Sequence, residues 1–183
     1  VDNFSVAVEP TAPTLLFGTI WPNGAFEDGA NLDQPANGLP TGWQRGGNDA
    51  TIDVVTTENS ASSTHALAVE DNSATGYGEW YANVNLAGRA SDGDALKLQW
   101  FELFNVSGGG EMRLTVLFWD ANNALLSEKH YVAKNQSGGW AGDLACSTFT
   151  KRNEEVTVPA GATRLQVSLV SGGPAETTGV MVI

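Results

Sequence analysis

Apolar and polar residues alternate along short stretches of the chain, and glycine-, asparagine- and serine-rich segments separate these stretches. Alternation with a period of two is typical of strands with one face in the core and one in solvent. Apolar spacing of three and four never persists long enough to predict a helix. Short strands at this spacing indicate an all-β fold, a β-sandwich (jelly roll) of two antiparallel sheets. The strands are expected at 1–8, 51–56, 66–70, 79–85, 95–104, 111–119, 128–132, 154–158, 163–170 and 179–183.

The alternation also predicts which side chains face the core. The inward set is Leu96, Leu98, Trp100, Leu114, Val116, Phe118, Leu165, Val167 and Leu169. The outward set includes Lys97, Gln99, Arg113, Thr115, Trp119, Arg164 and Gln166. We interpret 95–119 as a hairpin that turns at Gly108–Gly110. If these strands share a sheet, one face carries Arg, Gln, Thr and Trp.

Such a face suits a glycan, because aromatic rings stack on sugar faces and planar polar groups bond sugar hydroxyls. It also suits a protein interface, where Arg and Trp are enriched, and simple solvent exposure is a third interpretation. We therefore predict ligand-binding roles for Trp119, Arg113, Gln99, Gln166 and Arg164. The glycine-rich loop SATGYGE (73–79), with Tyr77, and the Trp80 that follows it add two stacking candidates, although neighbouring Trp80 and Tyr81 must point to opposite faces.

Composition narrows the class of protein. The 183 residues suit one domain, and a hydrophobic content of 42% favours folding. The net charge of −12 argues against nucleic acid, which requires a basic face, and is compatible with calcium and neutral ligands. The single cysteine, Cys146, excludes an internal disulfide. No run is apolar enough to span a membrane. Few charges and many small polar residues are typical of a secreted or cell-surface all-β protein.

The two ends of the sequence suggest a domain organisation. Residues 1–8 are expected to form a detached or closing strand, residues 9–14 (EPTAPT) a proline-containing linker, and residues 15–183 the sandwich. GVMVI at 179–183 followed by VDNFSV would read as one long closing strand. The chain is then one unit of a tandem array, a subunit whose first strand completes another copy, or a domain completed by its own first strand. A boundary without meaning is the fourth alternative.

Several motifs together resemble a known family. WPNGAFEDG at 21–29, LPTGW at 39–43, STHALAVE at 63–70 and VPAGATRLQVSLV at 158–170 follow one another as in jelly-roll carbohydrate-binding modules. The resemblance is to the group that includes families 4, 9, 16 and 22. Its usual closing G-x-x-x-[IV]-D-[DN] strand is missing after Gly179, whereas Val1-Asp2-Asn3-Phe4 matches it at the other end of the chain. In that family the residue matching Trp43 is a packing residue.

The resemblance implies a structural calcium ion near the start of the domain. Glu27 matches a family calcium ligand directly, and Asp2 matches one only if 1–8 takes the position of the last strand. Asn23 and Ser63 lie in the neighbouring segments. Calcium prefers six to eight oxygen ligands, so carboxylates and carbonyls fit it. The alternative is that Glu27 and Asp28 are solvated turn residues.

The leading hypothesis is a non-catalytic module that binds a polysaccharide, expected to be neutral. The second is a structural repeat of an extracellular fibre or adhesin, assembled by strand complementation through residues 1–8. The third is a polysaccharide hydrolase or lyase, which needs paired carboxylates or a Tyr–His pair in one cleft. Tyr131 and His130 are neighbours on one strand and are expected to face opposite ways. The expected partners are a polysaccharide and copies of the chain or a tandem neighbour, not nucleic acid or membrane.

Overall fold

A computed structural model describes residues 4–9, 23, 26–32, 38–47, 52–56, 65–71, 76–108, 111–134, 144–145, 150–172 and 177–182. Strands and turns make up this described part, and it contains no helix. The prediction of an all-β fold is therefore confirmed. It follows that none of the described segments is a helix long and apolar enough to cross a bilayer.

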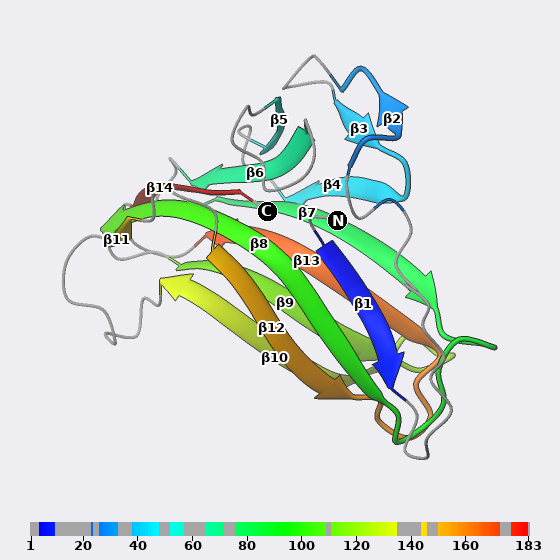
Figure 1. Ribbon diagram of the computed structural model, residues 1–183. Coiled ribbons are helices and arrows are strands. Elements are labelled where there is room, and N and C mark those ends of the chain that lie inside the picture. The colour runs from blue at the N-terminus through cyan, green and yellow to red at the C-terminus, as the bar shows by residue number, and fades with distance from the viewer. Residues whose placement is uncertain are drawn as a thin grey trace.

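Two antiparallel sheets and a short ribbon form the molecule (Figure 1). One sheet runs β1 (Phe4–Glu9), β8 (Ala95–Gly108), β14 (Thr177–Val182), β6 (His65–Asp71) and β5 (Ile52–Thr56), with β12 (Thr150–Thr157) and β11 (Leu144–Ala145) on the other edge of β8. The second runs β10 (Leu125–Lys134), β9 (Glu111–Trp119), β13 (Arg164–Gly172), β7 (Tyr77–Asn85) and β4 (Trp43–Gly47). The ribbon pairs β2 (Gly29–Ala30) with β3 (Leu39–Pro40).

The core lies between the two sheets, as the alternation predicts. All nine residues of the expected inward set are buried, at 2% exposure or less. They form one cluster with Trp43, Trp80, Leu67 and Val69 from β4, β7 and β6. Burial of these apolar side chains from both sheets is what holds the sandwich together.

The predicted hairpin over 95–119 is wrong. β8 pairs with β1, β12, β14 and β11, whereas β9 pairs with β10 and β13 in the other sheet. The connection after Gly108 therefore crosses from one sheet to the other. Each strand has one apolar face, and alternation alone does not specify whether two such strands lie side by side or face to face across the core.

Four short strands were not predicted, namely β2, β3, β4 and β11. Two residues, or a segment rich in glycine such as Trp43–Gly47, give too short a pattern to recognise. Gly47 has a backbone reason for its identity. Its φ is +88°, and a Cβ at this position would lie 2.2 Å from the Tyr77 carbonyl oxygen of β7. A glycine is thus required where β4 meets the first residues of β7.

β1 pairs with β8 of the same chain, from Phe4 opposite Trp100 to Glu9 opposite Ala95. This arrangement corresponds to the alternative in which the first strand completes its own domain. Pro10 and Pro13 of the predicted linker lie outside the described residues.

Candidate functional site

The outward face of the five-stranded sheet carries most of the predicted ligand-binding residues. Because directly opposed residues of an antiparallel pair share a face, the register arranges these side chains in rows across the strands. One row is Asn85, Arg164 and Trp119; the next is Asn83, Gln166, Leu117 and Glu128; the third is Gln44, Tyr81, Ser168, Thr115 and His130; the fourth is Gly46, Glu79, Val170 and Arg113.

The structure thus brings five predicted residues onto one face, namely Trp119, Arg113, Gln166, Arg164 and, at the far end of β7, Tyr77. Tyr81 and Gln44 also lie on this face, where the Tyr81 hydroxyl donates to Gln44 Oε1 at 2.6 Å. In the middle, Gln166 Nε2 donates to Ser168 Oγ at 3.0 Å. The small side chains Ser168 and Thr115 are nearly covered by their longer neighbours, at 1% and 3% exposure.

A pocket lies at the Trp119 end of this face. Its volume is about 360 Å³, and it is lined by Asn83, Asn85, Asp120, Ala121, Asn123, Thr163 and Arg164. The Arg164 guanidinium carbon lies 5.1 Å from the centre of the Trp119 ring. Neither Trp119 Nε1 nor Arg164 Nε has a hydrogen-bond acceptor among the described residues. The pocket therefore combines three amides, one carboxylate and one guanidinium beside an indole ring.

Asp120 is fixed by the turn that follows β9. Its Oδ1 accepts hydrogen bonds from the Ala124 and Asn122 backbone N–H groups, at 2.7 and 2.8 Å. The bond from Ala124 is the main cause that holds the pKa of Asp120 below its ordinary value, with a smaller opposing effect from desolvation. The carboxylate therefore stays ionised and remains an acceptor for hydroxyl donors. This turn has no role predicted from the sequence, and its residues 120–123 (DANN) are the signal for it.

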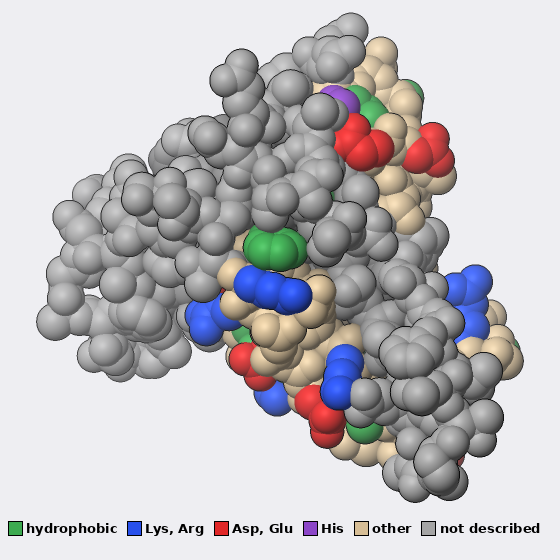
Figure 2. Space-filling model, viewed as in Figure 1, with side chains coloured by type: hydrophobic (Ala, Val, Ile, Leu, Met, Phe, Trp, Pro, Cys, Tyr) green, Lys and Arg blue, Asp and Glu red, His purple; other side chains and the backbone are tan. Residues whose placement is uncertain are grey.

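Gln99 does not lie with the other candidates. It is on β8, and its Nε2 donates to Asn153 Oδ1 of β12 at 2.8 Å on the opposite side of the sandwich. The expectation that Gln99 shares a face with Arg113 and Arg164 is wrong, because β8 and β9 belong to different sheets. Figure 2 looks onto β8 and β12 and shows Lys and Arg side chains interleaved with Asp and Glu. The described side chains of this face carry mixed charges, and Lys151 Nζ lies 5.8 Å from the centre of the Phe101 ring.

Trp80 is a core residue. It is 0% exposed, and its indole N–H donates to the Ala68 carbonyl oxygen at 3.1 Å. A stacking role for Trp80 is therefore corrected: alternation along β7 places it inward and Tyr81 outward. Tyr77 is 47% exposed at the start of β7, next to β4 and away from the pocket. Trp43 is buried against Phe26, as the resemblance implies, with ring centres 5.3 Å apart.

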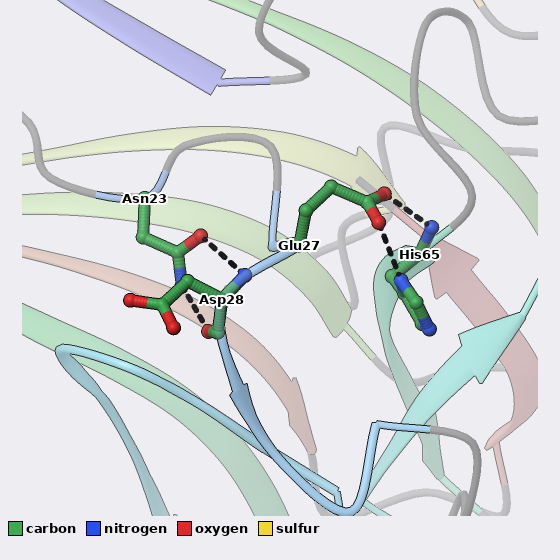
Figure 3. A network of polar contacts seen from close by, with 4 residues as sticks. All are labelled: Asn23, Glu27, Asp28 and His65. Atoms are coloured by element: carbon green, nitrogen blue, oxygen red, sulfur yellow. Dashed lines mark hydrogen bonds and ion pairs between the residues drawn. The ribbon is translucent and has the colours of Figure 1, made fainter.

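The N-G-x-F-E motif forms a tightly bonded loop (Figure 3). Asn23 Nδ2 donates to the Asp28 and Thr41 carbonyl oxygens at 2.7 and 3.1 Å, and Asn23 Oδ1 accepts from the Asp28 N–H at 3.2 Å. Phe26 enters the core with a φ of +61°, a strained conformation for a bulky residue that this loop holds in place. The motif is thus explained by loop geometry and core packing.

Glu27 pairs with His65 at the start of β6. Its Oε1 accepts from the His65 backbone N–H at 2.9 Å, and its Oε2 lies 2.8 Å from His65 Nδ1. The structure contains no group of three or more Asp, Glu, His or Cys residues arranged to hold a metal, within the ranges that it describes. Asp2 and Ser63 lie outside those ranges. The Glu27 carboxylate is bonded to His65, and the Asn23 amide donates to the Asp28 and Thr41 carbonyl oxygens. These two groups are not by themselves a calcium site, so the calcium ion stays a prediction.

His130 and Tyr131 face opposite ways, as expected. His130 lies opposite Thr115 on the outward face and pairs with Glu128. Tyr131 lies opposite Leu114 and packs edge-on against Trp100, with ring centres 5.2 Å apart. These two residues therefore do not form a Tyr–His pair in one cleft.

Comparisons with known proteins relate the chain to others by fold. No family model and no curated protein sequence matches it. Among solved structures, a segment of the enzymatically active domain of tailspike protein 4 from bacteriophage CBA120 superposes with a TM-score of 0.52 at 12% identity, over 78% of this chain. The chain spans only 18% of that tailspike structure. At this identity the likeness supports the β-sandwich fold and nothing further.

Carbohydrate-binding modules are also among the similar structures. TmCBM61 in complex with β-1,4-galactotriose has 15% identity and a TM-score of 0.42, and covers 77% of this chain and 84% of its own. The CBM22-2 xylan-binding domain of Xyn10C from Paenibacillus barcinonensis has 13% identity and a TM-score of 0.46, and covers 80% and 91%. These values are too low to transfer a ligand or a site.

Proposed function

We propose that the chain is a non-catalytic carbohydrate-binding domain that holds a neutral polysaccharide on the outward face of its five-stranded sheet. The binding site begins at Trp119 and Arg164 and includes the pocket beside them. The observation that carries this proposal is the pocket lining, in which amides, a guanidinium and a carboxylate converge next to an indole ring.

The chemistry of this lining matches sugar hydroxyls. Asn83 and Asn123 each offer an acceptor and two donors in one plane, Asn85 offers its donors while its Oδ1 accepts from the Ala87 N–H at 2.8 Å, and Asp120 offers acceptors only. Trp119 Nε1 and Arg164 Nε are buried donors without an acceptor among the described residues, so the hydrogen bonds to the glycan are assigned to the amides and the carboxylate of the lining. The face of an indole ring stacks against the C–H face of a pyranose, which adds apolar burial to the hydrogen bonds.

The charges of the pocket favour a neutral glycan. Arg164 and Asp120 bring one positive and one negative charge, and the other lining residues are uncharged. The chain as a whole has a net charge of −12, which disfavours strongly anionic polysaccharides. A polysaccharide ligand fits a protein that acts outside the cell or at its surface.

The acidic residues of this face support binding rather than hydrolysis. Glycoside hydrolysis requires two carboxyl groups that face each other across the scissile bond. Here Asp120 accepts two backbone hydrogen bonds and Glu128 pairs with His130. Glu79, the third described acidic residue of this face, lies opposite Val170 and Gly46, and the register places none of the three carboxylates opposite another.

Affinity electrophoresis tests the proposal. Gels that contain soluble xylan, β-1,4-galactan, β-glucan, mannan or an anionic control such as alginate are run with the wild type, with Trp119→Ala and with Lys97→Ala. Lys97 is a matched control, because it is exposed on the opposite sheet. We expect retardation by at least one neutral polysaccharide, its loss in Trp119→Ala and its retention in Lys97→Ala. Retardation only by alginate, or equal loss in both variants, would overturn the assignment.

A further inference from the structure

One edge of β8 is covered by two strand segments that come from distant parts of the sequence. β14 lies along Gly108–Leu103, from Thr177 opposite Gly108 to Val182 opposite Leu103. β1 lies along Trp100–Ala95. Both are antiparallel to β8, so they run in the same direction and follow one another in line. Only Phe101 and Glu102 of β8 separate their described ends. Together they form one closing strand in two pieces.

β1 is the weakly attached piece. It pairs with β8 alone among the strands described, whereas β14 pairs with both β8 and β6. β1 is therefore an edge strand held by one ladder of main-chain hydrogen bonds. Edge positions of this kind accept a strand from another chain with the same geometry.

The β8 edge does not depend on β1 for its position. On its other side, β12 pairs with β8 from Thr150 opposite Glu102 to Thr157 opposite Ala95. Arg152 Nε donates to the buried carboxylate of Glu102 at 2.5 Å, and Trp100 Nε1 donates to the same carboxylate at 3.0 Å. Leu96, Leu98 and Trp100 are anchored in the core. An acceptor edge for β1 is thus held in place from the opposite side.

The connection after β1 is long. Figure 1 shows that β1 ends at one end of the sandwich, whereas β2 and β3 lie at the other. Residues 10–28 join β1 to β2, and the 13 residues of this connection that precede Asn23 would reach roughly 45 Å if fully extended. Pro10 and Pro13 lie within it, and proline favours stiff, extended chain over a compact return.

We propose that β1 is an exchangeable strand: the β8 edge at Ala95–Trp100 accepts β1 from a second copy of this chain in the same antiparallel register. In the closed form β1 pairs with β8 of its own chain, and in the exchanged form it pairs with β8 of another copy through identical contacts. The balance between the two forms therefore depends on protein concentration and on the conformation that residues 10–22 favour. Reciprocal exchange between two copies closes a two-fold dimer, whereas exchange from each copy to the next extends an open chain. This inference is independent of the proposed glycan site.

Single-cysteine variants detect the exchanged form in the full-length chain. Ser5 lies opposite Gln99 in the register, and Cα atoms of opposed residues are about 4.5–5.5 Å apart, within the range that a disulfide bridges. Ser5→Cys and Gln99→Cys are made separately, each with Cys146→Ser, mixed at high concentration and oxidised. A disulfide between these two variants forms only between copies. Thr157→Cys is the matched control, since it is exposed on β12, on the far side of β8.

We expect a covalent dimer from Ser5→Cys with Gln99→Cys in large excess over Ser5→Cys with Thr157→Cys. A double variant carries Ser5→Cys and Gln99→Cys in one chain and is oxidised at low concentration. It should be a locked monomer, so its mass by light scattering should not rise with protein concentration. The mass of the wild type should rise. The double variant could form its intramolecular disulfide while the mixture of the two single variants forms no covalent dimer. That result would show that β1 stays in its own chain, and it would overturn the proposal. Failure of both disulfides refutes the register itself and overturns it equally.

Discussion

Replacing Arg152 by methionine should destabilise the fold through the carboxylate that it leaves behind. Glu102 has a side-chain exposure of 4%, and it accepts hydrogen bonds from Arg152 and from the Trp100 indole. Removing one partner of a buried ion pair costs about 3–5 kcal/mol, because the remaining charge is buried without compensation. The Arg152 side chain is 45% exposed, and the Trp100 bond remains. We therefore expect a loss below this range, about 2–3 kcal/mol of unfolding free energy.

A double-mutant cycle separates this effect from lost packing. Methionine keeps an unbranched apolar stem, so Arg152→Met removes mainly the guanidinium. Glu102→Gln removes the charge and retains an acceptor for the Trp100 N–H. If the cost of Arg152→Met comes from the stranded carboxylate, the combination with Glu102→Gln should recover at least half of it, giving a clear non-additive coupling.

Urea unfolding followed by tryptophan fluorescence measures these free energies, and equal m-values justify their comparison. A loss below about 0.5 kcal/mol for Arg152→Met would class the contact with exposed surface pairs. Strict additivity in the cycle would refute the stranded-charge explanation even if both single variants were unstable.

Three further predictions concern other parts of the fold. Trp80→Ala should cost about 3–5 kcal/mol in urea unfolding, since Trp80 is fully buried; a change within 0.5 kcal/mol would contradict its core position. Burial, assisted by Glu154, raises the pKa of Tyr131 from 10 to about 12. The folded state should therefore lose stability as pH rises from about 10 to 12, and the loss should be smaller in Tyr131→Phe. A stability difference between wild type and Tyr131→Phe that does not change with pH would contradict this prediction. Calcium at about 100 times its Kd should raise the free energy of unfolding by about 2.7 kcal/mol relative to the chelator-treated protein. It should have little effect on Glu27→Gln. The absence of any calcium response in the wild type would rule out the calcium site.

The faces of the strands could be predicted from the sequence, because alternation depends only on local geometry. Leu114 and Val116 are buried and Arg113 is outward on β9, and the same holds along β8 and β13. The fold class followed from the same pattern, since many strands with one apolar face must cover one another.

The pairing of strands could not be predicted in the same way. β8 and β9 follow each other closely, and glycine between them suggested a hairpin, yet β9 pairs with the next strand, β10, and with β13, whereas β8 pairs with β1, β11, β12 and β14. Gln99 was therefore assigned to the wrong side of the sandwich. Trp80 was misjudged because a tryptophan after a glycine-rich loop fits both a stacking site and the core, and only its bond to Ala68 and its burial decide. Asn83, Asn85 and Asp120 reach one pocket only through tertiary packing of β7, β9 and β13.

Chemical-shift mapping of the bound state tests the central claim most directly. The ¹⁵N-labelled chain is titrated with an oligosaccharide of the polysaccharide that retards it in affinity gels. We predict that the shifts gather on β7, β9 and β13 and on the turn at Asp120–Asn123, and that the Trp119 indole N–H moves while those of Trp80 and Trp100 stay nearly unchanged. Shifts confined to β8 and β12, or the absence of any shift with every neutral oligosaccharide tested, would contradict a glycan site on this face.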